Sequence, residues 1–266
     1  MTVWRLLSDG AQAGAWNMAL DRAVQIAYEQ GVAPPTVRLY EWDRPTVSLG
    51  RFQDVASVDT QFCAASGIAM VRRHTGGRGV LHDDEVTYSV IAGVKDGIPR
   101  GTKASYSMLC GGVAQAYRLL GVDAALTARS RGSRASAACY LHATQADLSF
   151  GVRKLSGSAQ VWLGATVLQH GSFTVSRDIE REAAVFRLTA EERGHLAEQT
   201  ATIEAILGAR PARERVREAI AAGFARELGV EIVEGALSEH EVEIATRLHT
   251  ELLEDGSDDV HVTGSR

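Results

Sequence analysis

Residues 72–91 read RRHTGGRGVLHDDEVTYSVI, and this stretch decides how the rest of the chain is interpreted. It begins at the end of an apolar run, IAMVRR at residues 68–73, which predicts a strand. It ends inside EVTYSVIAG at residues 85–93, where polar and apolar residues alternate with the period of a second strand. The glycine-rich segment between them is therefore predicted to be a loop that joins two strands.

The loop has the composition of an anion-binding turn. Its glycines, which permit left-handed backbone angles and close approach of main-chain amides to a ligand, are Gly76, Gly77 and Gly79. The arginines that edge it, which suit a phosphate or a carboxylate, are Arg72, Arg73 and Arg78. The pattern is neither the P-loop nor the dinucleotide-binding fingerprint. Taken by itself, it fits a glycine hairpin with solvated arginines equally well.

The elements predicted around this loop alternate between helix and strand. Upstream, strands are predicted at residues 2–8, 33–42 and 46–52, and helices at 13–31 and 58–67. Downstream, a helix is predicted at 105–121, a short strand at 122–126, and antiparallel strands with glycine turns at 146–175. The chain is strongly helical after residue 179, and no linker or repeat divides it. We expect one α/β domain over residues 1–254, with a mixed, largely antiparallel sheet flanked by helices, and a frayed tail at 255–266.

Composition excludes several functional classes. The 266 residues are 45% apolar and 23% charged, with a net charge of −5, so the chain as a whole has no electrostatic reason to bind nucleic acid or an anionic membrane. No signal peptide and no window long enough to span a membrane are predicted. The three cysteines form no C-x-x-C pair, which argues against a disulfide framework and a metal site. A cytoplasmic protein with reduced thiols is the simplest expectation.

Two later segments also place polar groups beside glycine turns. In VRKLSGSAQ, residues 152–160, Lys154 precedes a turn built from Ser156, Gly157 and Ser158. In LQHGSF, residues 168–173, His170 stands next to Gly171 at the end of a β-rich run. Most lysines are solvated surface charges, and a lone histidine is more often structural than catalytic. Neither segment identifies a site by itself.

Together, the three segments in this order resemble the lipoate-protein ligase and octanoyltransferase superfamily, which shares its catalytic fold with biotin protein ligases. The resemblance extends more loosely to NMALDRAV and PTVRLYEWDRPTVSLGRFQ, and covers the chain from Trp4 to about Leu253. It implies that the glycine loop and the lysine surround an acyl chain and its activated head group. The positions that it assigns to substrate binding are Arg73, Thr75, Gly76, Gly77, Arg78, Gly79, His82, Ser156, Gly157, Ser158, Ala159, His170 and Gly171.

Cys139 is the position that separates the two chemistries of this superfamily. Ligases activate free lipoate with ATP and carry no catalytic cysteine, whereas octanoyltransferases transfer octanoate through a cysteine thioester. Cys139 lies fifteen residues before Lys154, where the cysteine-dependent octanoyltransferases of the Gram-positive type carry their nucleophile. The resemblance thus implies that Cys139 and Lys154 are catalytic. Cys63 and Cys110 fall on predicted helices and are expected to be buried thiols.

The charges around Cys139 suit a nucleophilic thiolate. An unperturbed cysteine, with a pKa of about 8.5, is only slightly ionised at neutral pH, and neighbouring cations raise that fraction. Five cations flank Cys139 in the sequence, namely Arg129, Arg131, Arg134, Arg153 and Lys154. If Lys154 folds back onto Cys139, it favours the thiolate and can donate a hydrogen bond to the thioester carbonyl. Without the resemblance, a small buried apolar residue would be the simpler interpretation of Cys139.

The expected reaction is the transfer of octanoate from octanoyl-acyl carrier protein to a lysine of a lipoyl domain or of glycine-cleavage H protein. It would need neither ATP nor a metal, and the enzyme would be a monomer. Lys154 and His170 are both candidates for the base that deprotonates the acceptor amine. Because the carrier and the lipoyl domain are acidic, we expect a basic patch at the rim of the tunnel that holds the acyl chain. This patch would be built from residues 129–134 with Arg72, Arg73 and Arg78.

Three alternatives remain at this stage. An ATP-dependent lipoate-protein ligase shares the glycine loop and the lysine, but Cys139 and the short C-terminus argue against it. An octanoyl amidotransferase that takes octanoate from H protein also uses a cysteine, although its glycine loop matches less well. A non-catalytic protein that only binds acylated carriers would not need Cys139 and Lys154 together.

Overall fold

The structure is a computed structural model that describes residues 2–126, 131–132, 137–143 and 147–254. For residues 131–132 and 142–143 it describes the backbone alone. The predicted tail at 255–266 and two of the arginines expected near Cys139, Arg129 and Arg134, lie outside the described residues.

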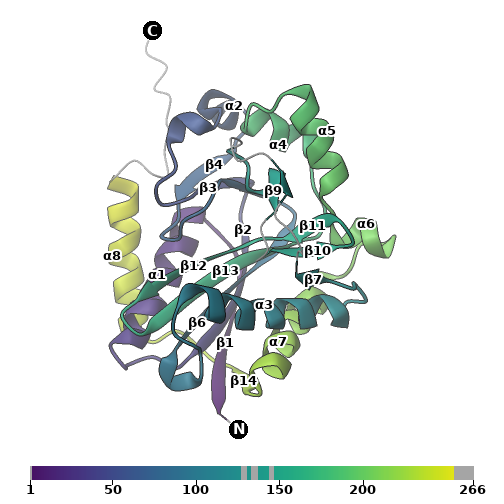
Figure 1. The fold of residues 1–266 in the computed structure, drawn as a ribbon. Helices are drawn as coiled ribbons and strands as arrows, with labels where there is room; N and C mark the ends of the chain where they lie inside the picture. Colours follow the sequence, from purple (N-terminus) through teal and green to yellow (C-terminus); the bar gives the residue numbers. More distant parts are fainter. Residues whose placement is uncertain (1, 127–130, 133–136, 144–146, 255–266) are drawn as a thin grey trace.

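A mixed sheet with the strand order β12-β13-β6-β2-β1-β14 forms the centre of the fold (Figure 1). Its strands are β1 (Val3–Gln12), β2 (Thr36–Trp42), β6 (Glu85–Gly93), β12 (Ser158–Leu163), β13 (Thr166–Thr174) and β14 (Glu231–Glu234). The pairs β12/β13, β13/β6 and β6/β2 are antiparallel, and β2/β1 and β1/β14 are parallel. The prediction of a mixed, largely antiparallel sheet flanked by helices is confirmed.

Helices cover both faces of this sheet (Figure 1). On one face α1 (Gly14–Glu29) and α8 (Glu239–Glu254) form a core with the sheet, and on the other α3 (Thr102–Leu119) and α7 (Arg213–Leu228) do so. The paired glycines that interrupt the predicted α3 allow α7 to approach, because a Cβ at Gly112 would lie 2.4 Å from Cδ1 of Phe224. Among the described residues, no helix has the length and apolarity that a membrane crossing requires.

A smaller sheet with the order β4-β3-β5 carries the glycine loop. Its strands are β3 (Thr46–Leu49), β4 (Ala69–Arg72) and β5 (Val80–His82), and β3 is parallel to β4 and antiparallel to β5. It shares a core with α2 (Thr60–Ala65), α4 (Ile179–Val185), α5 (Ala190–Gln199) and the short helix η3 (Cys139–Leu141). This second core therefore brings the glycine loop and the segment of Cys139 together.

The remaining elements are short. A third sheet pairs β7 (Ala125–Leu126), β10 (Leu148–Phe150) and β11 (Arg153–Ser156), and a two-stranded ladder pairs β8 (Arg131–Gly132) with β9 (His142–Ala143). The other helices are α6 (Ile203–Leu207), η1 (Val55–Ser57) and η2 (Val94–Asp96).

The sequence prediction missed β14 and β5, and also the two-residue strands β8 and β9. The C-terminal part was predicted to be helical, but β14 pairs in parallel with β1, with Val3 opposite Glu231. Without this pairing, β1 would be an edge strand with unpaired backbone donors and acceptors, and β14 satisfies them. The strand β5 was also missed, because it occupies only three residues inside the predicted loop.

Candidate active site

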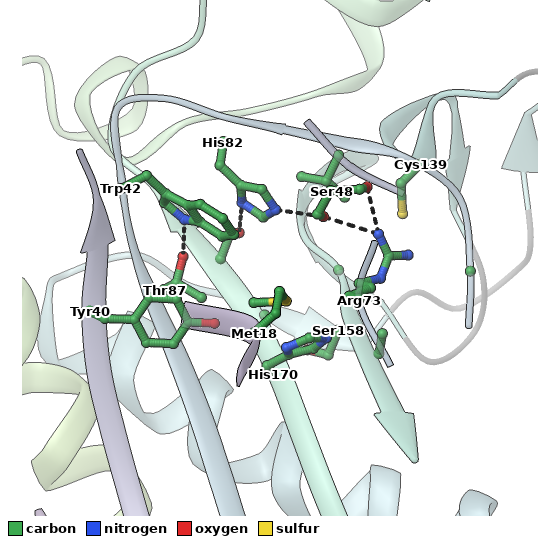
Figure 2. Close-up of a pocket in the computed structure, with 16 residues that line it drawn as sticks. Met18, Tyr40, Trp42, Ser48, Arg73, His82, Thr87, Cys139, Ser158 and His170 are labelled. Atoms are coloured by element: carbon green, nitrogen blue, oxygen red, sulfur yellow. Dashed lines mark hydrogen bonds between the residues drawn. The ribbon is translucent and has the colours of Figure 1, made fainter. Parts of the chain in front are cut away.

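A pocket opens between the central sheet, the small sheet and the segment of Cys139 (Figure 2). It encloses about 490 Å³, part of which is open to solvent. Met18, Tyr40, Trp42 and Val80 give it apolar walls that suit an acyl chain. Nine of the residues expected to be catalytic or substrate-binding line it, namely Arg73, Gly77, His82, Cys139, Gly157, Ser158, Ala159, His170 and Gly171.

The other expected residues lie behind the pocket wall or within the glycine loop. These are Thr75, Gly76, Arg78, Gly79, Lys154 and Ser156. Thr75, Lys154 and Ser156 are buried, and the hydroxyl of Ser156 donates to the carbonyl of Ser172 at 2.9 Å. Ser156 thereby ties β11 to β13, which carries the lining residue Ser172.

The glycine loop positions the backbone of Cys139 directly. The amide of Gly79 donates to the carbonyl of Ala137 at 3.1 Å, and the amide of Cys139 donates to the carbonyl of Gly79 at 2.9 Å. A side chain at position 79 would collide with Phe186, because its Cβ would lie 2.6 Å from Cε1 of that ring. Glycine at position 79 thus lets Phe186 pack against the loop at the point where the loop pairs with the Cys139 segment.

Substituting Gly79 with alanine is accordingly expected to disturb Cys139 without removing any functional group. We expect Gly79→Ala to cost about 1–3 kcal/mol of unfolding free energy and to slow acylation of Cys139 about tenfold. Phe186→Leu in the same chain should restore much of the acylation rate, because it removes the ring atoms that collide. Urea unfolding and mass-detected acylation measure the two effects.

The matched control is Gly194→Ala, since a Cβ at that exposed helix position meets nothing within 4 Å. Acylation of Gly79→Ala at the wild-type rate would show that the pairing does not position the cysteine.

Arg73 holds the glycine loop from inside. Its side chain is buried, and Nη2 donates to the carbonyls of Gly76 at 2.8 Å and Arg78 at 2.7 Å. Nη1 donates to the carbonyl of Ser48 at 2.8 Å, and Nε donates to Oγ1 of Thr75 at 3.1 Å. Burial lowers the pKa of Arg73 to about 10, although the nearby Cys139 thiolate acts to raise it. The guanidinium therefore stays charged at neutral pH and faces Cys139.

The expected basic patch for a carrier protein is wrong in part. Arg73 is buried and cannot meet a protein surface. Arg72 is partly buried, and its Nη1 donates to the carbonyls of Gly50 at 2.9 Å and Gln53 at 2.7 Å. Both side chains turn inward and donate hydrogen bonds to main-chain carbonyls that need donors. Residues 129–130 and 133–134 of the expected patch lie outside the described residues, as does the side chain of Arg131.

Lys154 folds back onto Cys139. Its Nζ lies 3.7 Å from Sγ and 3.1 Å from the carbonyl oxygen of Cys139. The same Nζ is 3.1 Å from Oδ2 of Asp147, and both side chains are buried. Burial acts to lower the pKa of Lys154, but the Cys139 thiolate and the Asp147 carboxylate outweigh it and raise that pKa. A permanent ammonium therefore faces the sulfur.

Sequence reasoning missed Asp147. Residue 147 immediately precedes β10, and β10 pairs with β11, where Ser149 is opposite Lys154. A hairpin register drawn from ADLSFGVRKLS would have placed this carboxylate near the lysine.

The other two cysteines are buried thiols, as predicted. Cys63 lies on α2 and Cys110 on α3. Burial raises the pKa of Cys63 to about 11 and that of Cys110 to about 12, so neither is a thiolate at neutral pH. Cys139, in contrast, is partly exposed and lines the pocket.

A row of polar residues crosses the central sheet beneath α1. Arg38 on β2, Ser89 on β6 and His170 on β13 are neighbours in register. Asp21 of α1 accepts hydrogen bonds from Arg38 and Ser89, each at 2.8 Å, and lies 3.4 Å from Nδ1 of His170. Nε2 of His170 is 2.8 Å from Oγ1 of Thr75. Both ring nitrogens of His170 therefore have partners.

A second polar group surrounds His82 at the other side of the pocket. Its Nδ1 is 2.6 Å from Oε1 of Glu85. Its Nε2 is 2.8 Å from Oγ of Ser48 (Figure 2). The ring stacks on Trp42 with the centroids 4.1 Å apart. Oε1 of Glu85 also accepts from the hydroxyls of Thr87 at 2.8 Å and Ser172 at 2.7 Å, so this oxygen of the buried carboxylate has three partners.

Residues of both polar groups recur periodically in the sequence, and the sequence prediction did not interpret these periods as part of a site. Polar residues recur every fourth position along α1 and every second position along β6, as Asn17, Asp21 and Gln25 and as Glu85, Thr87 and Ser89. Such periods usually indicate a solvated face. Here the two faces meet each other, and all six residues are buried.

Acid is expected to destabilise the fold through these carboxylates. Burial acts to raise the pKa of Asp21 and of Glu85. The contacts of Asp21 with His170 and Arg38 outweigh this effect and hold its pKa below the usual range. The contact of Glu85 with His82 does the same for the pKa of Glu85. Their stabilisation is complete above the unfolded-state pKa, about 4, and is lost as pH falls through the lowered folded-state values. Urea unfolding from about pH 6 to pH 3 should show this loss, with a shallower slope in Glu85→Gln. Equal slopes would contradict it.

The comparisons with known proteins agree with this geometry. Residues 13–225 match the family described as the lipoyl protein ligase A/B catalytic domain. Octanoyltransferase LipM of Kyrpidia tusciae is 39% identical over 268 residues, covering 96% of this chain and 98% of the relative. Octanoyltransferase LipM of Moorella thermoacetica is 38% identical over 250 residues, covering 90% and 91%. A solved lipoate-protein ligase A bound with ATP superposes with a TM-score of 0.77 at 24% identity, covering 94% of each chain.

Proposed function

The chain belongs to the lipoyl protein ligase A/B catalytic domain family and is an octanoyltransferase, and we propose that Cys139 carries the octanoyl group between donor and acceptor. The donor would be octanoyl-acyl carrier protein, and the acceptor a lysine of a lipoyl domain or of glycine-cleavage H protein. The observation that carries this proposal is the contact of the buried Lys154 ammonium with Sγ of Cys139 at 3.7 Å. Residues 1–254 would act as one catalytic domain.

In the first half-reaction, the Cys139 thiolate attacks the thioester carbonyl of the donor. A new C–S bond forms at Cys139, and the carrier's thiolate leaves. Lys154 and Arg73 favour this step because both present positive charge to the sulfur, where the reacting carbonyl will develop negative charge. The octanoyl chain would lie against Met18, Tyr40 and Trp42.

In the second half-reaction, the acceptor amine attacks the octanoyl-cysteine. A C–N bond forms, the C–S bond breaks, and the thiolate returns to Cys139 beside Lys154. The thioester that enters is already activated, so the proposed route needs neither ATP nor a metal ion. A thiolate nucleophile also needs a reducing compartment, so we propose the cytoplasm as the location of the reaction.

Intact-mass measurement under two conditions tests this function. With octanoyl-acyl carrier protein and no ATP, we expect an octanoyl adduct on the enzyme within one turnover, and its loss when H protein is added. Release of free carrier in an initial burst should accompany the adduct. Acceptor modification only with ATP and free acid would show a ligase instead, and no adduct or product under either condition would leave an acyl-carrier binder.

A further inference from the structure

His82 links a buried carboxylate to a hydroxyl on the pocket wall. Glu85 contacts Nδ1 of the ring at 2.6 Å, and Ser48 contacts Nε2 at 2.8 Å. All three side chains are at least nine-tenths buried, and both His82 and Ser48 line the pocket that contains Cys139. A carboxylate, an imidazole and a hydroxyl in this order can pass a proton.

The hydrogen-bond partners of Ser48 allow a proton to move from its hydroxyl toward His82. Nη1 of Arg73 donates to Oγ of Ser48 at 3.1 Å, and an arginine cannot accept. In the tautomer of His82 that carries its proton on Nδ1 and donates it to Glu85, Nε2 accepts the hydroxyl proton of Ser48. Ser48 retains a second lone pair, which can accept from a ligand in the pocket.

The relay ends close to the reacting sulfur. Figure 2 shows hydrogen bonds running from His82 to Ser48 and on to Arg73, next to Cys139. The charge of the Cys139 thiolate acts on Arg73, which places the two groups in one electrostatic environment. Ser48 and Cys139 line the same pocket, so an amine that reaches a thioester on Cys139 can also approach the hydroxyl of Ser48.

We propose that His82 is the base of the second half-reaction and takes the proton of the acceptor lysine through the hydroxyl of Ser48. As the neutral amine attacks, its proton moves to Oγ of Ser48, while the proton of Ser48 moves to Nε2 of His82. The imidazolium is stabilised by Glu85. In the next first half-reaction it returns that proton to the departing thiolate of the carrier, so that one cycle leaves the enzyme unchanged. This inference rests on the proposed thioester at Cys139.

The two other candidate bases are less suitable. Lys154 lies 3.1 Å from the buried Asp147 carboxylate, which favours its ammonium form even when Cys139 is acylated. His170 is arranged in a similar way with Asp21 and Thr75, but its carboxylate contact is 3.4 Å and Thr75 is fully buried and not part of the pocket lining. Ser48, unlike Thr75, can be reached by a substrate.

The test starts from preformed octanoyl-enzyme and compares two nucleophiles. With H protein as acceptor, we expect His82→Gln to slow single-turnover transfer about 100-fold and Glu85→Gln about tenfold. Hydroxylamine is uncharged at neutral pH and a strong nucleophile, so its cleavage of the adduct should change less than about threefold. Imidazole in solution should restore transfer by His82→Ala, which a purely structural role would not allow. His195→Gln, at an exposed histidine on α5, is the matched control.

Transfer by His82→Gln at the wild-type rate, or equal slowing with both nucleophiles and no rescue by imidazole, would overturn the proposal. Absence of any adduct in the wild-type enzyme would instead refute the proposed function.

Discussion

Cys139→Ala is expected to abolish the octanoyl adduct and to lower octanoyl transfer at least about 10⁴-fold. No other cysteine in the described residues can replace it, because burial holds the pKa of Cys63 at about 11 and that of Cys110 at about 12. The pocket should still bind the acyl chain, because its apolar walls are unchanged. Intact-mass analysis after incubation with octanoyl-acyl carrier protein measures the adduct, and modified H protein measures turnover.

Two further variants make this test specific. Cys139→Ser keeps the size of the side chain but replaces the thiolate with an un-ionised hydroxyl, so transfer should stay at least about 10³-fold below wild type. Cys63→Ala removes a thiol on α2, outside the pocket lining, and should form the adduct normally. Turnover by Cys139→Ala at more than about a tenth of the wild-type rate would exclude a covalent intermediate at this position.

Lys154→Met should have the second largest effect. It removes the ammonium 3.7 Å from Sγ, and we expect acylation of Cys139 to slow about 10³-fold. It also leaves the buried Asp147 carboxylate without its cation, at a cost of about 3–5 kcal/mol of unfolding free energy. Stopped-flow or quenched-flow mass analysis measures acylation, and urea unfolding measures stability.

A double variant separates these two effects. Lys154→Met with Asp147→Asn removes both charges, so most of the lost stability should return. Acylation should remain slow, because no ammonium faces the sulfur. Recovery of acylation together with stability would mean that Lys154 acts only as a structural partner of Asp147.

The sequence was sufficient for five of the six strands of the central sheet, for the glycine loop and for nine of the sixteen residues that line the pocket. These depend on local patterns, namely strand periodicity, a glycine cluster and the spacing of Cys139 from Lys154. Only the resemblance to a known superfamily indicated that this spacing marks a catalytic pair. From local chemistry alone, Cys139 could be a small buried residue and Lys154 a solvated surface charge.

The side chains that contact Lys154 and His82 could not be predicted from such local patterns. Asp147, Glu85 and Ser48 act across strand pairs or between layers, and a pattern along one element does not show which face another element will cover. The inward turn of Arg73 was missed for a related reason. The carbonyls of the glycine loop have few hydrogen-bond donors within the loop, so the Arg73 guanidinium donates to them. Which carbonyls lack a donor is known only once the loop is folded.

The backbone pairing of Cys139 with Gly79 has a consequence for how the enzyme can diverge. Both hydrogen bonds join main-chain atoms, so they do not depend on the side chains at positions 137 and 138. The side chains at those positions are limited instead by the core of the small sheet, in which Ala138 is fully buried and against which Ala137 packs. Gly79 is limited more strictly, because any larger residue meets Phe186. Selection on this enzyme should thus act on side-chain size immediately before the nucleophile, and exclude every side chain at a glycine sixty residues upstream of it.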